Sequence, residues 1–156
     1  MKIENKLKAM GYSLPCTPKP GGLYVPSKRV GNLIFISGQT PTISGIHQIT
    51  GIVGEDLSLE EGQKAAQICA LNVLSILKNE LDDLDRVKQF VQVVGFVRSG
   101  KNFNLQPQVI NGASELFLSL YGESGLATRL AIGTNEIPGG AAVEILVVVE
   151  VESDDN

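Results

Sequence analysis

Two charged side chains in apolar surroundings are the strongest candidates for chemistry in this sequence. Glu144 interrupts the apolar run 141–149, and Arg129 lies among small and apolar residues in the stretch 127–132. An ionised carboxylate inside an apolar strand is costly unless it is paired or hydrogen-bonded. A guanidinium binds a carboxylate through two parallel hydrogen bonds. The two side chains could therefore form a structural ion pair, lie at an exposed edge, or bind and act on a carboxylate ligand.

The remaining residue types that often do chemistry give weaker signals. His47 is the only histidine and lies in a turn-rich stretch, where a lone histidine is usually an ordinary surface residue. Cys69 falls on the apolar stripe of an expected helix, and together with Cys16 it forms no metal-binding spacing. The glycine pairs lack the spacing of a nucleotide-binding fingerprint. We therefore expect no metal site.

Length and charge limit the classes of protein that this chain can belong to. Its 156 residues suit one domain (1–156), with an N-terminal helix and proline-rich extension at 1–20 and a frayed acidic tail at 152–156. The net charge of −4 disfavours a large nucleic-acid-binding surface. The N-terminus lacks the apolar region of a signal peptide, and no run approaches the roughly 18–20 apolar residues of a membrane helix. We expect a cytoplasmic protein.

Periodicity predicts the elements that must position Arg129 and Glu144. Helices are expected at 3–10, 58–81 and 107–121, an irregular proline-rich segment at 12–28, and strands at 33–36, 48–53, 87–97, 126–134 and 142–151. Ser58 and Glu61 have the spacing of a capping box, and the strand 87–97 has the composition of one buried on both faces. This order indicates an α+β sheet with the two longer helices on one face. The last strand is apolar on both faces, so the other sheet face is expected to pack on a second copy of the chain.

Four stretches carry a family resemblance, in the same order and with similar spacing. They are Gly22 to Val25, Val30 to Pro41, Val109 to Asn111, and Arg129 through Ile137-Pro138 to Glu144. Together they resemble the Rid (YjgF, reactive intermediate deaminase) family, which is also labelled endoribonuclease L-PSP. Three departures resemble those of a divergent branch of that family. They are a longer N-terminus, Pro26 in place of a polar residue, and Ala131 in place of a frequent cysteine.

The resemblance implies a chorismate-mutase-like mixed sheet and a homotrimer with three clefts, each lined by two chains. It implies that Arg129 holds the carboxylate of a small enamine or imine acid and that Glu144 orients or activates the attacking water. Tyr24 matches a tyrosine that closes the cleft from a neighbouring subunit. The positions of Ser37, Gly38 and Asn111 match residues that line or support the pocket.

The expected activity is hydrolytic deamination of a small enamine or imine acid to a 2-oxo acid and ammonia, with no metal or organic cofactor. One alternative is a non-catalytic trimer that binds a small carboxylate metabolite, for which Arg129 alone would suffice. Another is an endoribonuclease or translation inhibitor, against which the acidic charge balance argues. A chorismate mutase is suggested by the fold alone, and fold does not set function.

Overall fold

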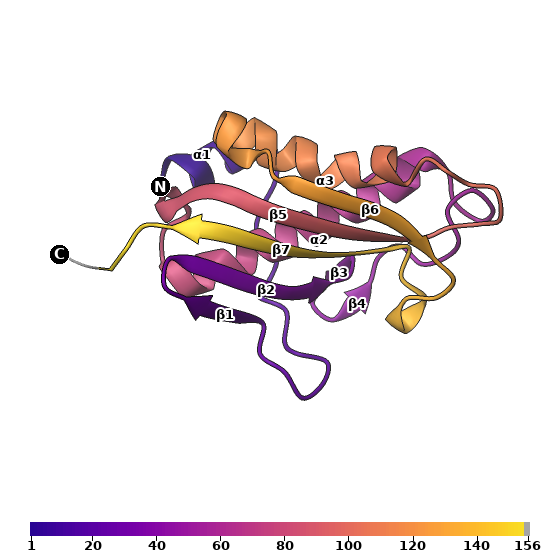
Figure 1. Ribbon diagram of the computed structural model, residues 1–156, viewed down its shortest axis with the longest axis horizontal. Helices are drawn as coiled ribbons and strands as arrows, with labels where there is room; N and C mark the ends of the chain where they lie inside the picture. Colours follow the sequence, from indigo (N-terminus) through magenta and orange to yellow (C-terminus); the bar gives the residue numbers. More distant parts are fainter. Residues whose placement is uncertain (155–156) are drawn as a thin grey trace.

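A mixed β-sheet forms the centre of the computed structural model, which describes residues 1–154 (Figure 1). Within these residues its strand order is β1-β2-β7-β5-β6. The strands are β1 (Ser27–Val30), β2 (Leu33–Gln39), β5 (Val87–Arg98), β6 (Thr128–Thr134) and β7 (Val143–Val151). Neighbouring strands are antiparallel except for β5 and β6, which are parallel. The predicted α+β class with a mixed sheet is confirmed.

Two long helices, α2 (Leu59–Leu81) and α3 (Gln106–Tyr121), cover one face of this sheet (Figure 1). Helix α3 connects β5 to β6, as parallel neighbours require a crossover. The predicted capping box of α2 is present. The Glu61 N–H donates to Ser58 Oγ at 3.1 Å, and the Ser58 N–H donates to the Glu61 carboxylate at 2.7 Å. Cys69 is fully buried on α2, as its place on the apolar stripe predicts.

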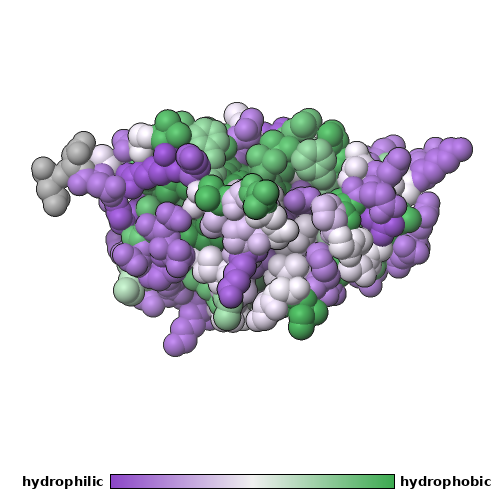
Figure 2. Space-filling view, turned by 90° about the horizontal axis from the view of Figure 1, so that it is seen from below, coloured by the Kyte–Doolittle hydropathy of each residue, from purple (hydrophilic) through white to green (hydrophobic). Residues whose placement is uncertain are grey.

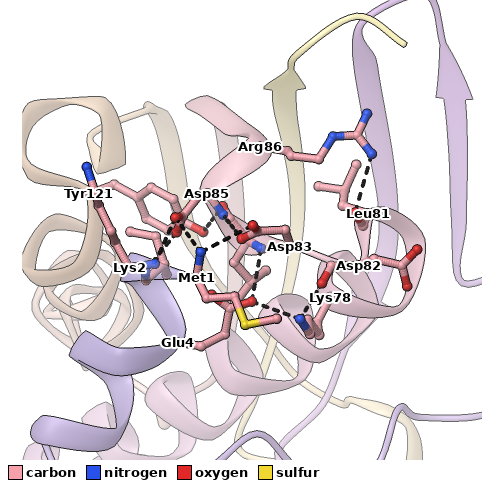
Figure 3. Close-up of polar contacts among 12 residues, drawn as sticks. Met1, Lys2, Glu4, Lys78, Leu81, Asp82, Asp83, Asp85, Arg86 and Tyr121 are labelled. Atoms are coloured by element: carbon pink, nitrogen blue, oxygen red, sulfur yellow. Dashed lines mark hydrogen bonds and ion pairs between the residues drawn. The ribbon is translucent and has the colours of Figure 1, made fainter.

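The N-terminal helix α1 (Lys2–Ala9) is attached to the body of the protein by its apolar side. Polar contacts attach its first residues as well (Figure 3). Ile3 and Leu7 are buried as predicted, whereas Met10 follows the helix and is 41% exposed. The Asp85 carboxylate accepts hydrogen bonds from the backbone N–H groups of Lys2 at 2.7 Å and Ile3 at 2.8 Å. Asp85 thus caps a helix that lies more than eighty residues earlier in the chain.

The sequence prediction is wrong in the segments on either side of β2. The stretch 48–53 forms only isolated bridges, and the strands there are the short hairpin of β3 (Thr42–Ile43) and β4 (Ile46–His47). Ser44 and Gly45 in its turn have φ angles of 52° and 78°, which a two-residue hairpin turn requires. Strand β1 lies partly within the segment 12–28, which was expected to be irregular. The last two residues of that segment contain no proline and pair with β2.

The sheet face turned away from α2 and α3, here called the open face, is apolar and exposed in the chain by itself. Phe35 on β2 and Leu130 and Ile132 on β6 are 45%, 50% and 41% exposed. Green side chains gather along the upper edge of Figure 2, which is this side of the sheet. Strand β5 is therefore buried mainly on its helix-facing side, and the prediction that it is buried on both faces is wrong for the single chain.

The described part of the acidic tail, residues 152–154, is held against the sheet rather than frayed. The Glu152 N–H donates to the carbonyl of Arg86 at 2.9 Å. The Asp154 carboxylate contacts the guanidinium groups of both Arg86 and Arg29. These contacts, the hydrogen bond from Arg86 above all, lower the pKa of Asp154. Residues 155–156 of the predicted tail lie outside the described residues.

Candidate functional site

A cavity of about 1020 Å³ opens beside Glu144 and contains four of the predicted site residues. Its walls come from the proline-rich segment 16–21, the end of β2, the β3–β4 hairpin and the turn at Pro138 and Gly139. The predicted residues among its lining are Tyr24, Ser37, Gly38 and Glu144. Tyr24 therefore shares a cavity with Glu144 of its own chain.

A β-bulge brings the backbone of β2 against Glu144. Ile36 pairs with Val147 and Gln39 with Ile145, so Ser37 and Gly38 together face a single residue of β7. A Cβ atom on Gly38 would lie 2.5 Å from Glu144 Oε1. Glycine is thus the residue that allows the carboxylate to lie here.

Ser37 supports the loop that carries Tyr24. Its hydroxyl donates to the carbonyl of Val25 at 2.6 Å, and its N–H donates to the carbonyl of Pro26 at 2.9 Å. The Tyr24 hydroxyl in turn accepts a hydrogen bond from the N–H of Gly21 at 3.0 Å. In this structure the role of Ser37 is to fix one wall of the cavity.

The Glu144 carboxylate is partly buried and has no hydrogen-bond or ion-pair partner among residues 1–154. Burial raises the pKa of Glu144 above its usual value, because the surroundings solvate the charge less well than water does. A carboxyl group of this kind can take up and release a proton closer to neutral pH than an exposed glutamate. Its environment suits general acid–base chemistry on a small ligand.

The Arg129 guanidinium is held by three acceptors from α3, at a smaller hollow of about 270 Å³. It donates to Asn111 Oδ1 at 2.7 Å, to Ser114 Oγ at 3.2 Å and to the carbonyl of Pro107 at 3.4 Å. Arg129 is nonetheless exposed, so its oriented guanidinium can reach a ligand carboxylate. Asn111, predicted to line or support the pocket, orients the arginine here.

Arg129 and Glu144 lie on opposite faces of the sheet in one chain. Arg129 is in register with Val93, which is buried on the helix-facing side. Glu144 is in register with Phe96, three residues further along β5 and therefore on the other side. The ion pair between the two, which the sequence left open, is not formed.

Sequence reasoning missed several residues that the structure places at these two hollows. Ser114 lies three residues after Asn111, on the same side of α3, and that spacing could have indicated it. His47 lines the cavity of Glu144 and packs against Gly139, where a Cβ atom would lie 2.1 Å from its Nε2. Lys19 lines the same cavity. No local pattern brings either of these two residues to Glu144.

Within residues 1–154, one group of acidic side chains is close enough to share a cation. The carboxylates of Glu4, Asp83 and Asp85 lie within 4.8 Å of one another (Figure 3). They already contact the Met1 ammonium, the Lys78 ammonium and backbone N–H groups. Their contacts are those of a structural cluster at α1.

No helix among the described residues is long and apolar enough to cross a membrane.

Comparison with known proteins places the chain among relatives that match nearly its whole length. It is 40% identical to protein TCP17 of Trypanosoma cruzi over 97% of this chain and 96% of that protein. It is 26% identical to a 2-iminobutanoate/2-iminopropanoate deaminase of Dermatophagoides farinae over 90% of this chain and 94% of that protein. The crystal structure of Atu1372 from Agrobacterium tumefaciens, a protein of unknown function, is 40% identical. That structure superposes with a TM-score of 0.89, covering 97% of this chain and 94% of that one.

The family comparison agrees with the resemblance seen in the sequence. The sequence profile of the YjgF/chorismate mutase-like family, whose description carries a provisional endoribonuclease label, matches residues 4–151. That range includes the whole sheet, helices α2 and α3, helix α1 apart from Lys2 and Ile3, and both hollows described above. The chain therefore belongs to the YjgF/chorismate mutase-like family.

Proposed function

We propose that this chain is one subunit of a hydrolytic deaminase that converts small enamine or imine acids to 2-oxo acids and ammonia. The observation that carries the proposal is that an oriented Arg129 lies on the opposite sheet face from a partly buried Glu144, which has no partner among residues 1–154. Each hollow holds half of the groups that the reaction needs. Two copies of the chain, meeting so that Arg129 of one approaches Glu144 of the other, would complete the site.

The two residues have complementary roles in the proposed reaction. Arg129 holds the substrate carboxylate through two parallel hydrogen bonds from its guanidinium. Protonation of the enamine carbon gives the imine, and water then adds to the imine carbon. Glu144 orients that water, accepts its proton and passes it to the amino group, while the hydroxyl proton is lost to solvent as the carbon–nitrogen bond breaks. Collapse of the resulting carbinolamine breaks the carbon–nitrogen bond, releases ammonia and leaves the 2-oxo acid.

Two further observations support an assembly, which we propose to be a homotrimer. The open face exposes Phe35, Leu130 and Ile132, and an apolar face of this kind is typical of an interface. Leu23, next to Tyr24 at the rim of the Glu144 cavity, is fully exposed, which suits a contact with a neighbouring subunit. The named activity of the Dermatophagoides farinae relative is the same class of reaction.

A coupled assay tests the activity. An amino-acid dehydratase generates 2-aminoacrylate or its four-carbon homologue in the presence of purified protein, and formation of the 2-oxo acid is followed above the uncatalysed rate. We expect acceleration by the natural protein and loss of about a hundredfold or more in Glu144→Gln, the lower range for removal of a general acid–base group. Arg129→Ala should lose the acceleration through weaker substrate binding. No acceleration by an assembled protein would rule out these substrates.

A mixing experiment tests whether the site is shared between subunits. Arg129→Ala and Glu144→Gln subunits are co-produced, so that assemblies contain both variants. If each site takes one residue from each of two subunits, about a quarter of the sites in a random mixture regain both residues. Activity should then recover to a similar fraction of the natural level. A mixture that stays as inactive as the separate variants would show that the two residues do not act across an interface.

The same variants separate the two alternatives. A non-catalytic carboxylate binder would lose its ligand in Arg129→Ala and would have no turnover for Glu144→Gln to remove. The endoribonuclease label of the family predicts cleavage of RNA, which a net charge of −4 does not favour. RNA cleavage that survives in both variants would point to a contaminating nuclease.

A further inference from the structure

The proline-rich segment forms a fixed wall of the Glu144 cavity. At its start, the buried Ser75 of α2 donates to the carbonyl of Pro15 at 2.8 Å, and its hydroxyl lies 3.1 Å from Thr17 Oγ1. At its end, the N–H of Gly21 donates to the Tyr24 hydroxyl. The segment is thus attached to α2 at its start, and just beyond Tyr24 the hydrogen bonds from Ser37 to the carbonyls of Val25 and Pro26 attach it to β2.

Lys19 lies in the middle of this wall, between Pro18 and Pro20. Among the described residues that line the cavity, it is the one lysine or arginine. Lys19 is exposed and forms no ion pair or hydrogen bond with another described residue through its side chain. The flanking prolines restrict the backbone, so less conformational freedom is lost when the ammonium binds a ligand.

The cavity is also larger than a three- or four-carbon acid needs. In the single chain its volume is about 1020 Å³, which leaves room for a longer acid as well as for the groups that a second subunit brings. One acidic group of a ligand is assigned to Arg129 by the proposed function, and Glu144 faces the reacting carbon. A second acidic group would be repelled by Glu144 unless a cation holds it at a distance.

We infer that Lys19 binds a second anionic group of the substrate, so that the cavity favours 2-imino dicarboxylic acids over 2-imino monocarboxylic acids. This inference rests on the proposed function for the site of the first carboxylate. In such a complex the two carboxylates are held by Arg129 of one subunit and Lys19 of the other. The imine carbon then lies between them, beside Glu144.

Turnover of two imine classes tests the inference. An amino-acid oxidase with catalase generates the imine of aspartate or of alanine in situ, and formation of the 2-oxo acid is compared for natural protein, Lys19→Gln and Lys64→Gln. Lys64 is an exposed lysine of α2 that lines neither hollow. We expect Lys19→Gln to lose about fivefold or more in kcat/KM for the dicarboxylate, the factor of one good ion pair, and to change little for the monocarboxylate. Equal losses for both imines, or no loss, would overturn the inference.

A binding measurement keeps the inference separate from the proposed function. Succinate and propanoate are titrated into the natural protein, Lys19→Gln and Lys64→Gln by calorimetry, and no turnover is required. If succinate binds more tightly than propanoate to the natural protein and to Lys64→Gln, but not to Lys19→Gln, the result supports the Lys19 contact even if no imine is hydrolysed. Equal affinity for the two acids in the natural protein would contradict the Lys19 contact even if deamination is observed.

Discussion

At the scale of single residues, the ionised form of Glu144 destabilises the folded protein. That form is the one that accepts a proton in the proposed reaction. The Glu144 carboxylate is partly removed from water and has no partner among the described residues that would compensate for the lost hydration. Burial therefore raises the pKa of this group, and the charged form is disfavoured in the folded state. Residues that weaken the fold in this way are typical of functional sites.

We predict that Glu144→Gln makes the protein more stable at pH 7 while it removes turnover. The folded-state pKa lies above the unfolded one, so the penalty is complete above the folded pKa and disappears as the pH falls toward the unfolded value. Glutamine carries no charge at any pH. The difference in melting temperature between the variant and the natural protein should therefore be largest near neutrality and vanish below about pH 4.

Thermal unfolding across this pH range measures the effect, with Glu123→Gln as the control, because Glu123 is exposed and lines neither hollow. A Glu144→Gln variant that is less stable than the natural protein at pH 7 would mean that the carboxylate contributes favourable contacts to the fold.

The bulge glycine permits a second test of the same carboxylate. In Gly38→Ala the new methyl group would lie 2.5 Å from Glu144 Oε1, so the carboxylate must move. We expect turnover to fall by at least about tenfold, since small displacements of a catalytic group are costly, while the fold is retained. Circular dichroism and the coupled assay measure the two quantities. Unchanged turnover would show that the position of the Glu144 carboxylate is not critical.

At the scale of elements, the sequence predicts those whose signals are local. The capping box at Ser58, the buried stripe through Cys69 and the apolar run of β7 each lie within one segment, and the structure confirms all three. The β3–β4 hairpin was missed because its turn uses Ser44 at a positive φ angle. Strand β1 was missed because its four residues are stabilised by pairing with β2 rather than by their own pattern.

The residues of the candidate site show the same difference between local signals and signals that depend on the folded chain. Arg129 and Glu144 could be found because a charge in an apolar run is unusual in the sequence itself. Ser114 could be placed at the site only from the register of α3 against β6. Lys19 could be placed there only from the path of a proline-rich segment, which has no hydrophobic periodicity. That Arg129 and Glu144 face opposite sides of the sheet depends on the pairing of both strands with β5.

Helix α1 provides a prediction about an element and its attachment. The Met1 ammonium, followed by the N–H groups of Lys2 and Ile3, holds the pKa of Asp85 well below its usual value (Figure 3). This stabilisation is present above the unfolded pKa of an aspartate and is lost as the pH falls through the folded one. We expect Asp85→Asn to destabilise the protein at pH 7 by about 1 kcal/mol, the net contribution of a typical hydrogen bond, because an amide nitrogen cannot accept the hydrogen bond that one carboxylate oxygen accepts from Lys2 or Ile3.

Urea unfolding measures this free energy, and hydrogen exchange shows whether residues 2–9 become less protected. Asp82→Asn is the matched control, because Asp82 has a φ angle of 60° that asparagine tolerates and its carboxylate has no hydrogen-bond partner among residues 1–154. If both variants lose equal stability, general charge effects account for the change and Asp85 does not cap α1.

At the scale of the whole molecule, the open face and the divided site point to the same requirement. A sheet that presents Phe35, Leu130 and Ile132 to water has apolar area that a second copy can cover. The two hollows, one on each side of the sheet, need a second copy to bring Arg129 to Glu144. Assembly and activity should therefore be lost together when the open face is altered.

We predict that Leu130→Asp separates the subunits and removes deamination, although Leu130 lines neither hollow of the chain. Leu130 is 50% exposed on β6, and a carboxylate there would be buried without a partner in the assembly. Met10→Asp is the matched control, because Met10 is 41% exposed after α1, outside the five-stranded sheet and outside the lining of both hollows. Analytical ultracentrifugation gives the mass of each variant, and the coupled assay gives its turnover. Monomeric Leu130→Asp with full activity would place the complete site within one chain, whereas an assembled, active variant would move the interface away from the open face.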